Sequence, residues 1–122
     1  GTIAGRKDLL EVDPSGELIR QLTTDESSSV RGYIATNKDL LVIDPSGEII
    51  RKLANDNKGF VRRNTAYRKD LLEVDPSGEI IRKLAQDPEE WVRIAINRTY
   101  DLSKLQINTN ESLLRNYIKY LL

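Results

Sequence analysis

The chain has no histidine, no cysteine and no methionine among its 122 residues. Without histidine and cysteine it lacks the usual zinc ligands, the ligands of iron–sulfur clusters, disulfides, thiol nucleophiles and imidazole bases. Most hydrolytic and redox mechanisms therefore lose a central group, and an enzyme would depend on carboxylates, Lys, Ser or Tyr. We expect a non-enzymatic protein with no cofactor and no metal site.

The sequence also lacks a net charge and long apolar runs. Its 19 Lys+Arg balance 19 Asp+Glu, so it has no long-range positive field for non-specific binding to nucleic acid or to an anionic membrane. No apolar run is long enough to cross a bilayer or to form a signal peptide. We expect a cytoplasmic protein with no membrane partner.

What the sequence has is a repeat with a period of 31 residues. Residues 6–23 and 68–85 differ at only three positions, whereas the other part of each unit varies widely. A fixed period of this length is typical of stacked repeat units, and agreement this close indicates recent duplication or consensus design. We therefore expect a single repeat domain over 1–122, made of a stub of a preceding repeat at 1–5, repeats at 6–36, 37–67 and 68–98, and a divergent C-terminal cap at 99–122.

The variable part of each unit has the pattern of a helix. In the third unit Asp87 is a good N-cap and Pro88 suits the first helical position. Val92 and Ile96 are four residues apart, which places them on one helical face. This pattern predicts a helix over about 87–98 and its counterparts.

The near-constant part predicts a second helix over about 76–86. Asp75 would cap its start, and Ile80, Ile81 and Leu84 form an apolar stripe at helical spacing. Residues 70–74 are too short for a proper α-helix, so we expect a 3₁₀ turn or an extended connector there. The expected fold class is all-α.

An alternative reading places β-hairpins at the Asp-Pro-Ser-Gly segments. Residues 75–78 would form a strong hairpin turn, and the apolar residues before them could form a strand. Against this alternative, residues 79–84 do not alternate between apolar and polar, and residues 87–98 have the pattern of a helix. The helical reading is favoured.

The same residues carry a family resemblance. Leu-Ala-Gln-Asp at 84–87, followed by Val92-Arg93, resembles the LA-x-D-x4-VR signature of leucine-rich repeat variant proteins and of the wider HEAT-like group. The period is longer than is typical of the variant repeats, and the cysteine cluster of some members is absent. The resemblance implies a right-handed α-solenoid that acts as a binding surface, and it does not by itself imply an activity.

One arginine recurs at the same place in every repeat, as Arg31, Arg62 and Arg93. A functional reading makes this row a track for phosphate or carboxylate groups, which would permit nucleic-acid binding in the manner of some HEAT-like proteins. A structural reading pairs each arginine with the capping aspartate or a helix-terminal carbonyl of an adjacent unit. We favour the structural ladder, because it explains why this arginine is constant while its neighbours vary. Zero net charge also does not favour a nucleic-acid partner.

The variable positions indicate a recognition surface. They place large aromatic and arginine side chains, which often anchor interfaces, among framework residues that stay constant. In the competing reading, Phe60 and Trp91 only fill the core between units. We expect a scaffold for a protein or peptide partner; the alternatives are nucleic-acid binding and a consensus-type or duplicated scaffold with no site of its own in this fragment. The candidate partner-binding residues are Tyr33, Phe60, Arg63, Tyr67 and Trp91.

The last ten residues, 113–122, have apolar side chains at helical spacing and end in two leucines. This pattern predicts a C-terminal capping helix that lies over the third repeat. Its apolar face could also support self-association.

Overall fold

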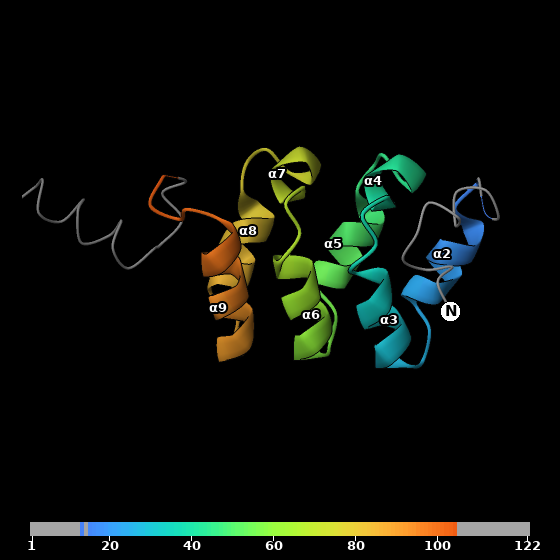
Figure 1. Ribbon diagram of the computed structural model, residues 1–122, viewed down its shortest axis with the longest axis horizontal. Helices are drawn as coiled ribbons and strands as arrows, with labels where there is room; N and C mark the ends of the chain where they lie inside the picture. Colours follow the sequence, from blue (N-terminus) through green and yellow to red (C-terminus); the bar gives the residue numbers. More distant parts are fainter. Residues whose placement is uncertain (1–12, 14, 105–122) are drawn as a thin grey trace, which may run out of the picture.

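The computed structural model describes residue 13 and residues 15–104, and its regular elements there are all α-helices (Figure 1). The all-α prediction is confirmed for these residues, and the hairpin alternative is wrong for them because they contain no strand. The predicted capping helix at 113–122 lies outside the described residues. In chain order the helices are α2 (Glu17–Thr23), α3 (Ser28–Ile34), α4 (Leu40–Ile43), α5 (Glu48–Ala54), α6 (Gly59–Ala66), α7 (Leu71–Val74), α8 (Glu79–Ala85) and α9 (Glu90–Thr99).

The helices lie in rows that follow the sequence period. α3, α6 and α9 begin 31 residues apart, lie side by side and run in the same direction (Figure 1). α2, α5 and α8 form a second row with the same spacing, and the short helices α4 and α7 lie along one edge of the rows, at the top of Figure 1. Each helix of a long row therefore packs against its own counterpart 31 residues away.

A tight turn opens each helix of the second row. The Gly47 N–H donates to the Asp44 carbonyl at 3.1 Å, and Gly47 has a φ of 75° at the N-cap of α5. The Asp44 carboxylate accepts a hydrogen bond from the Ile49 N–H at 2.8 Å. The turn of the hairpin alternative therefore exists but leads into a helix. The counterpart α8 begins at Glu79, later than the predicted start at 76.

The glycine of this turn also allows close packing. A Cβ atom at Gly47 would lie 2.7 Å from the Val74 Cγ1 atom of α7. A side chain at this position would collide with the next short helix, and its backbone conformation is one that L-residues rarely adopt. The repeated glycine therefore determines where α5 begins and allows α7 to pack closely against that turn.

The helices of the first row begin later than their predicted caps. α9 begins at Glu90 with Glu89 as N-cap, so the prediction of Asp87 as the N-cap is wrong. The Asp87 carboxylate instead accepts a hydrogen bond from the Glu89 N–H at 2.9 Å, in a turn just before the helix. Arg62 binds the same carboxylate. The counterpart Asp25 forms the same turn, with the Ser27 N–H at 2.8 Å, and α3 begins at Ser28 although no described arginine pairs with that carboxylate. The turn is therefore a local feature of the aspartate.

The segment at 70–74 also differs from its prediction. Leu71–Val74 is a single α-helical turn with buried Leu71 and Val74, rather than a 3₁₀ turn or an extended connector. The Leu71 N–H, which has no partner inside the turn, donates to the Tyr100 hydroxyl at 3.1 Å. A partner from a distant segment thus stabilises a helix that is too short to be stable alone.

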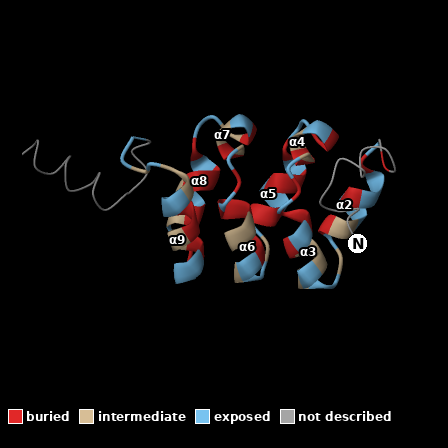
Figure 2. Cartoon of the chain, viewed as in Figure 1, coloured by how far each residue is buried: buried red, intermediate tan, exposed pale blue. Residues whose placement is uncertain are grey.

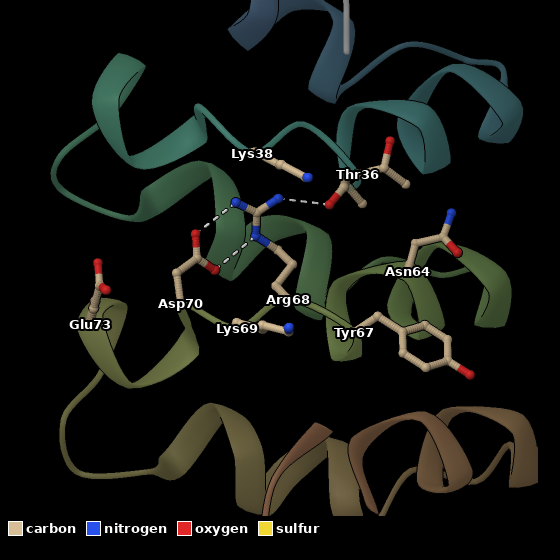
Figure 3. A pocket seen from close by; sticks show the side chains of 9 residues that line it. Thr36, Lys38, Asn64, Tyr67, Arg68, Lys69, Asp70 and Glu73 are labelled. Atoms are coloured by element: carbon tan, nitrogen blue, oxygen red, sulfur yellow. Dashed lines mark hydrogen bonds and ion pairs between the residues drawn. The ribbon is translucent and has the colours of Figure 1, made fainter. Parts of the chain in front are cut away.

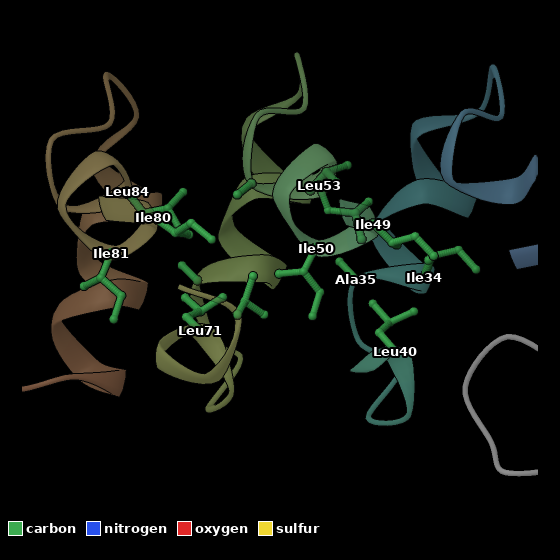
Figure 4. Packing of buried hydrophobic residues seen from close by; sticks show 14 of the residues in the cluster. Ile34, Ala35, Leu40, Ile49, Ile50, Leu53, Leu71, Ile80, Ile81 and Leu84 are labelled. Carbon is green, nitrogen blue, oxygen red and sulfur yellow. The ribbon is translucent and has the colours of Figure 1, made fainter. Parts of the chain in front are cut away.

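The core is a continuous layer of aliphatic side chains between the rows (Figures 2 and 4). The predicted stripe is confirmed, since Ile80, Ile81 and Leu84 are buried. Each such side chain contributes about 2 kcal/mol of hydrophobic stabilisation. Phe60, which was also a candidate core residue, keeps 36% of its surface exposed.

Candidate functional site

Arg31 and Arg62 join neighbouring groups of helices. The Arg31 Nε donates to the Asp56 Oδ2 at 2.7 Å, and its Nη2 donates to the Oδ1 at 3.2 Å. Arg62 binds Asp87 in the same way, at 2.7 and 3.1 Å. All four side chains are largely buried. These are bidentate, charge-assisted hydrogen bonds of the strong kind.

The third nitrogen of each guanidinium is bonded as well. The Arg31 Nη1 donates to the Asp25 carbonyl at 2.6 Å, and the Arg62 Nη1 donates to the Asp56 carbonyl at 2.7 Å. The hydrogen bond to Asp87 raises the pKa of Arg62 although burial opposes this, and the bond to Asp56 does the same for Arg31. These two cations are therefore engaged within the protein.

The row ends differently at Arg93. Its Nη1 donates to the Asp87 carbonyl at 2.5 Å, but it forms no ion pair with any described residue. The position that corresponds to the aspartate partner is occupied by Ile118, which lies outside the described residues. Arg93 therefore keeps the carbonyl contact and lacks the carboxylate contact in the described part of the chain.

The candidate partner-binding residues all belong to the row of α3, α6 and α9. We call them the variable face: Tyr33 on α3, Phe60 and Arg63 on α6, Tyr67 at its C-cap, and Trp91 on α9. Tyr33 is 44% exposed, Phe60 36%, Tyr67 45% and Trp91 67%. Arg63 is half-buried, and its Nη2 donates to the Asn64 Oδ1 at 3.4 Å. Large apolar side chains thus remain in contact with solvent along one row of helices.

The variable face has two levels. Phe60 and Trp91 lie in the first turns of α6 and α9, whereas Tyr33 lies in the last turn of α3 and Tyr67 follows the last turn of α6. Because the helices run in the same direction (Figure 1), Phe60 and Trp91 lie near the N-terminal ends of their helices, whereas the two tyrosines lie near the C-terminal ends of theirs. The face therefore extends both along the row and along the helix axes, and it does not converge on one point.

Phe60 reaches across to the neighbouring helix. A Cβ atom at Gly32 would lie 2.6 Å from the Phe60 Cε2, so the ring rests on the bare backbone of α3. Beside it, the Asn64 Nδ2 donates to the Gly32 carbonyl at 3.0 Å. Gly32 has no side chain, which leaves room for the aromatic ring of Phe60 in the next unit. The residues at these two variable positions are therefore complementary in size.

A cleft lies where α3 and α6 end, next to α7 (Figure 3). Its volume is about 530 Å³, and its lining includes Lys38, Tyr67, Arg68 and Lys69. Arg68 is only 8% exposed. Its Nε and Nη2 donate to the Asp70 carboxylate at 3.0 and 2.7 Å. An ion pair between the buried Arg68 and the partly exposed Asp70 thus forms the floor of the cleft.

The sequence patterns identified Tyr67 but not the other residues of this cleft. Lys38 and Lys69 occupy equivalent positions 31 residues apart, and each stands directly before the aspartate that precedes a short helix. Their recurrence in the sequence is the pattern that could have drawn attention to these lysines. It does not predict a cleft, because the two lysines come together only when two units pack.

The described residues contain neither a metal-ligand cluster nor a helix that could span a membrane. They bring together no group of three or more carboxylate, imidazole or thiol side chains that could hold a metal ion. Among the same residues, no helix has the length and apolar character needed to span a bilayer.

Comparisons with known proteins identify no relative of this chain. No protein-family model matches it, and neither the curated proteins nor the solved structures contain a match.

Proposed function

We propose that this protein is a non-enzymatic, cytoplasmic α-solenoid of three repeats whose variable face binds a protein or peptide. The observation that carries the proposal is a contrast between two sets of positions. Residues that recur along this row of helices include buried and paired ones, such as Val61 and the Arg62–Asp87 ion pair, whereas four of the five residues of the variable face expose more than a third of their surface. Exposed aromatic side chains on a rigid helical row are typical anchors of protein interfaces.

The alternative of nucleic-acid binding has less support. A phosphate track along the recurrent arginines would need free guanidinium groups, but Arg31 and Arg62 are bound to carboxylates on the inside of the structure. Opposite charges that compensate each other in this way do not release counterions from nucleic acid.

Selection of peptides tests the proposal. Random peptides displayed on phage are selected against the immobilised protein, and the strongest binder is synthesised and titrated by calorimetry. Trp91→Ala and Phe60→Ala should each weaken its binding about tenfold or more, because truncated aromatic anchors cost about 2 kcal/mol.

The matched control is Val42→Ala, which truncates a side chain that is 66% exposed on α4, outside the variable face. It should bind the peptide as the unmodified protein does. The proposal fails if no peptide is retained, or if Val42→Ala weakens binding as much as Trp91→Ala.

A further inference from the structure

The cleft at the ends of α3 and α6 has a floor that is already neutralised. The buried Arg68 binds the Asp70 carboxylate through two nitrogens. Its Nη1 donates to the carbonyls of Ala35 and Asn37 at 2.8 and 2.7 Å. All three guanidinium nitrogens of Arg68 are therefore bonded within the protein. The side chain has a structural role, because it links its own unit to the segment at 35–37.

The rim of the cleft, by contrast, carries free positive charge. Lys38 and Lys69 are exposed and form no ion pair or hydrogen bond with any described residue. Figure 3 shows their ammonium groups on either side of the Arg68 guanidinium, toward Tyr67, while Glu73 lies at the opposite end of the cleft. The end of the cleft beside Tyr67 is therefore positive.

Tyr67 supplies a further donor at this end. Its side chain is 45% exposed, and its hydroxyl has no hydrogen-bond partner among the described residues. The hydroxyl can donate to an oxygen that is bound between the two ammonium groups. Tyr67 also belongs to the variable face, so a chain bound along that face would reach the cleft without a gap.

We propose that this cleft binds the carboxylate side chain of an aspartate or glutamate in the peptide that occupies the variable face. The inference rests on the proposed function and specifies its partner as an acidic peptide. A volume of about 530 Å³ admits such a side chain with its flanking backbone. A polyanion such as DNA fits less well, because Glu73 at the other end of the cleft would repel its next phosphate.

The experiment uses the peptide selected against the immobilised protein. Its affinity is measured for the unmodified protein, for Lys38→Met/Lys69→Met and for the control Lys52→Met/Lys83→Met. The control lysines are also exposed and 31 residues apart, but they lie on α5 and α8 in the other row. Both variants remove the same charge, so long-range electrostatic effects cancel in the comparison. Thermal unfolding verifies that both are folded.

We expect selected peptides to contain Asp or Glu. Lys38→Met/Lys69→Met should weaken binding about tenfold and the control about twofold or less. A peptide in which the acidic residue is replaced by its amide should bind the unmodified protein as weakly as the acidic peptide binds Lys38→Met/Lys69→Met. This amide peptide should lose little further affinity on that variant, because the two changes remove one interaction.

Two failures can be told apart. If Phe60→Ala weakens binding but the Lys38→Met/Lys69→Met variant behaves like its control, the acidic-peptide inference is wrong and the proposed function stands. Selected peptides without acidic residues lead to the same conclusion. If no peptide binds in a way that depends on the variable face, both proposals are wrong.

Discussion

Replacement of Arg62 by alanine should lower the free energy of unfolding by about 3 kcal/mol. The guanidinium donates two hydrogen bonds to the Asp87 carboxylate, at 2.7 and 3.1 Å, and one to the Asp56 carbonyl at 2.7 Å. Hydrogen bonds to charged groups contribute about 1.5–3 kcal/mol each. The Arg62 side chain is 13% exposed and that of Asp87 6%, so the carboxylate would lose its cation in a poorly hydrated place.

A double-mutant cycle isolates the interaction itself. Urea unfolding of Arg62→Ala, Asp87→Ala and the double variant, followed by far-UV circular dichroism, should give a coupling energy of about 2 kcal/mol. Asp87→Ala alone should cost at least as much as Arg62→Ala, because the carboxylate also accepts the Glu89 N–H before α9.

Arg93 provides the matched control for this cycle. It occupies the same place in the next repeat, but its contact in the described part of the chain is with the Asp87 carbonyl. Arg93→Ala should therefore change the free energy of unfolding by no more than about 1 kcal/mol. An equal loss for Arg93→Ala and Arg62→Ala, or a coupling energy near zero, would refute the argument that the carboxylate pair stabilises the stacked units.

Three further predictions concern the turns, acid stability and nucleic acid. Gly47→Ala should cost about 2–3 kcal/mol in calorimetric unfolding, since its φ is 75° and the new Cβ would lie 2.7 Å from a side chain of α7. Gly59→Ala should stay within about 1 kcal/mol of the unmodified protein, because the new Cβ meets a flexible glutamate side chain at 3.0 Å; equal losses would contradict this. Burial opposes ionisation of the Asp44 carboxyl, but its hydrogen bonds and a nearby arginine outweigh this effect, so the pKa of Asp44 is lowered. A hydrogen bond from the Ser77 hydroxyl lowers the pKa of Asp75. Because the folded pKa values lie below the unfolded value of about 3.9, this stabilisation is present above about pH 5 and lost as the pH falls below about 4; a urea midpoint that rises on acidification would contradict it. Immobilised duplex DNA should not retain the protein at low salt, and retention that falls steeply with added salt would favour the nucleic-acid alternative.

The periodic parts of the fold could be predicted from the sequence because they depend on local spacing. Ile80, Ile81 and Leu84 recur at helical intervals, and this pattern alone indicated the face that α8 buries. The Asp-Pro-Ser-Gly segments likewise indicated a turn. Local chemistry did not decide whether this turn led into a strand or a helix, because both are compatible with a glycine at positive φ.

The start of α9 could not be predicted in the same way. Asp87 has the residue type of an N-cap, but its carboxylate is also bound by Arg62, which is 25 residues earlier in the chain. The carboxylate also accepts the Glu89 N–H in a local turn, and α9 begins after this turn, at Glu90. The counterpart Asp25 forms the same turn before α3 without an arginine partner among the described residues. An aspartate before a helix can either cap the helix or close a turn ahead of it, and its residue type alone does not decide between the two.

The sequence alone determined the period of the chain, its helical stripes and the set of variable positions, because each of these is a property of residue order. Tertiary structure alone decided that Phe60 rests on the backbone at Gly32, and that Lys38 and Lys69 meet at one cleft. Both results depend on how closely two units approach each other. That distance is set by the packing of side chains from both units, so it appears only when the helices are stacked.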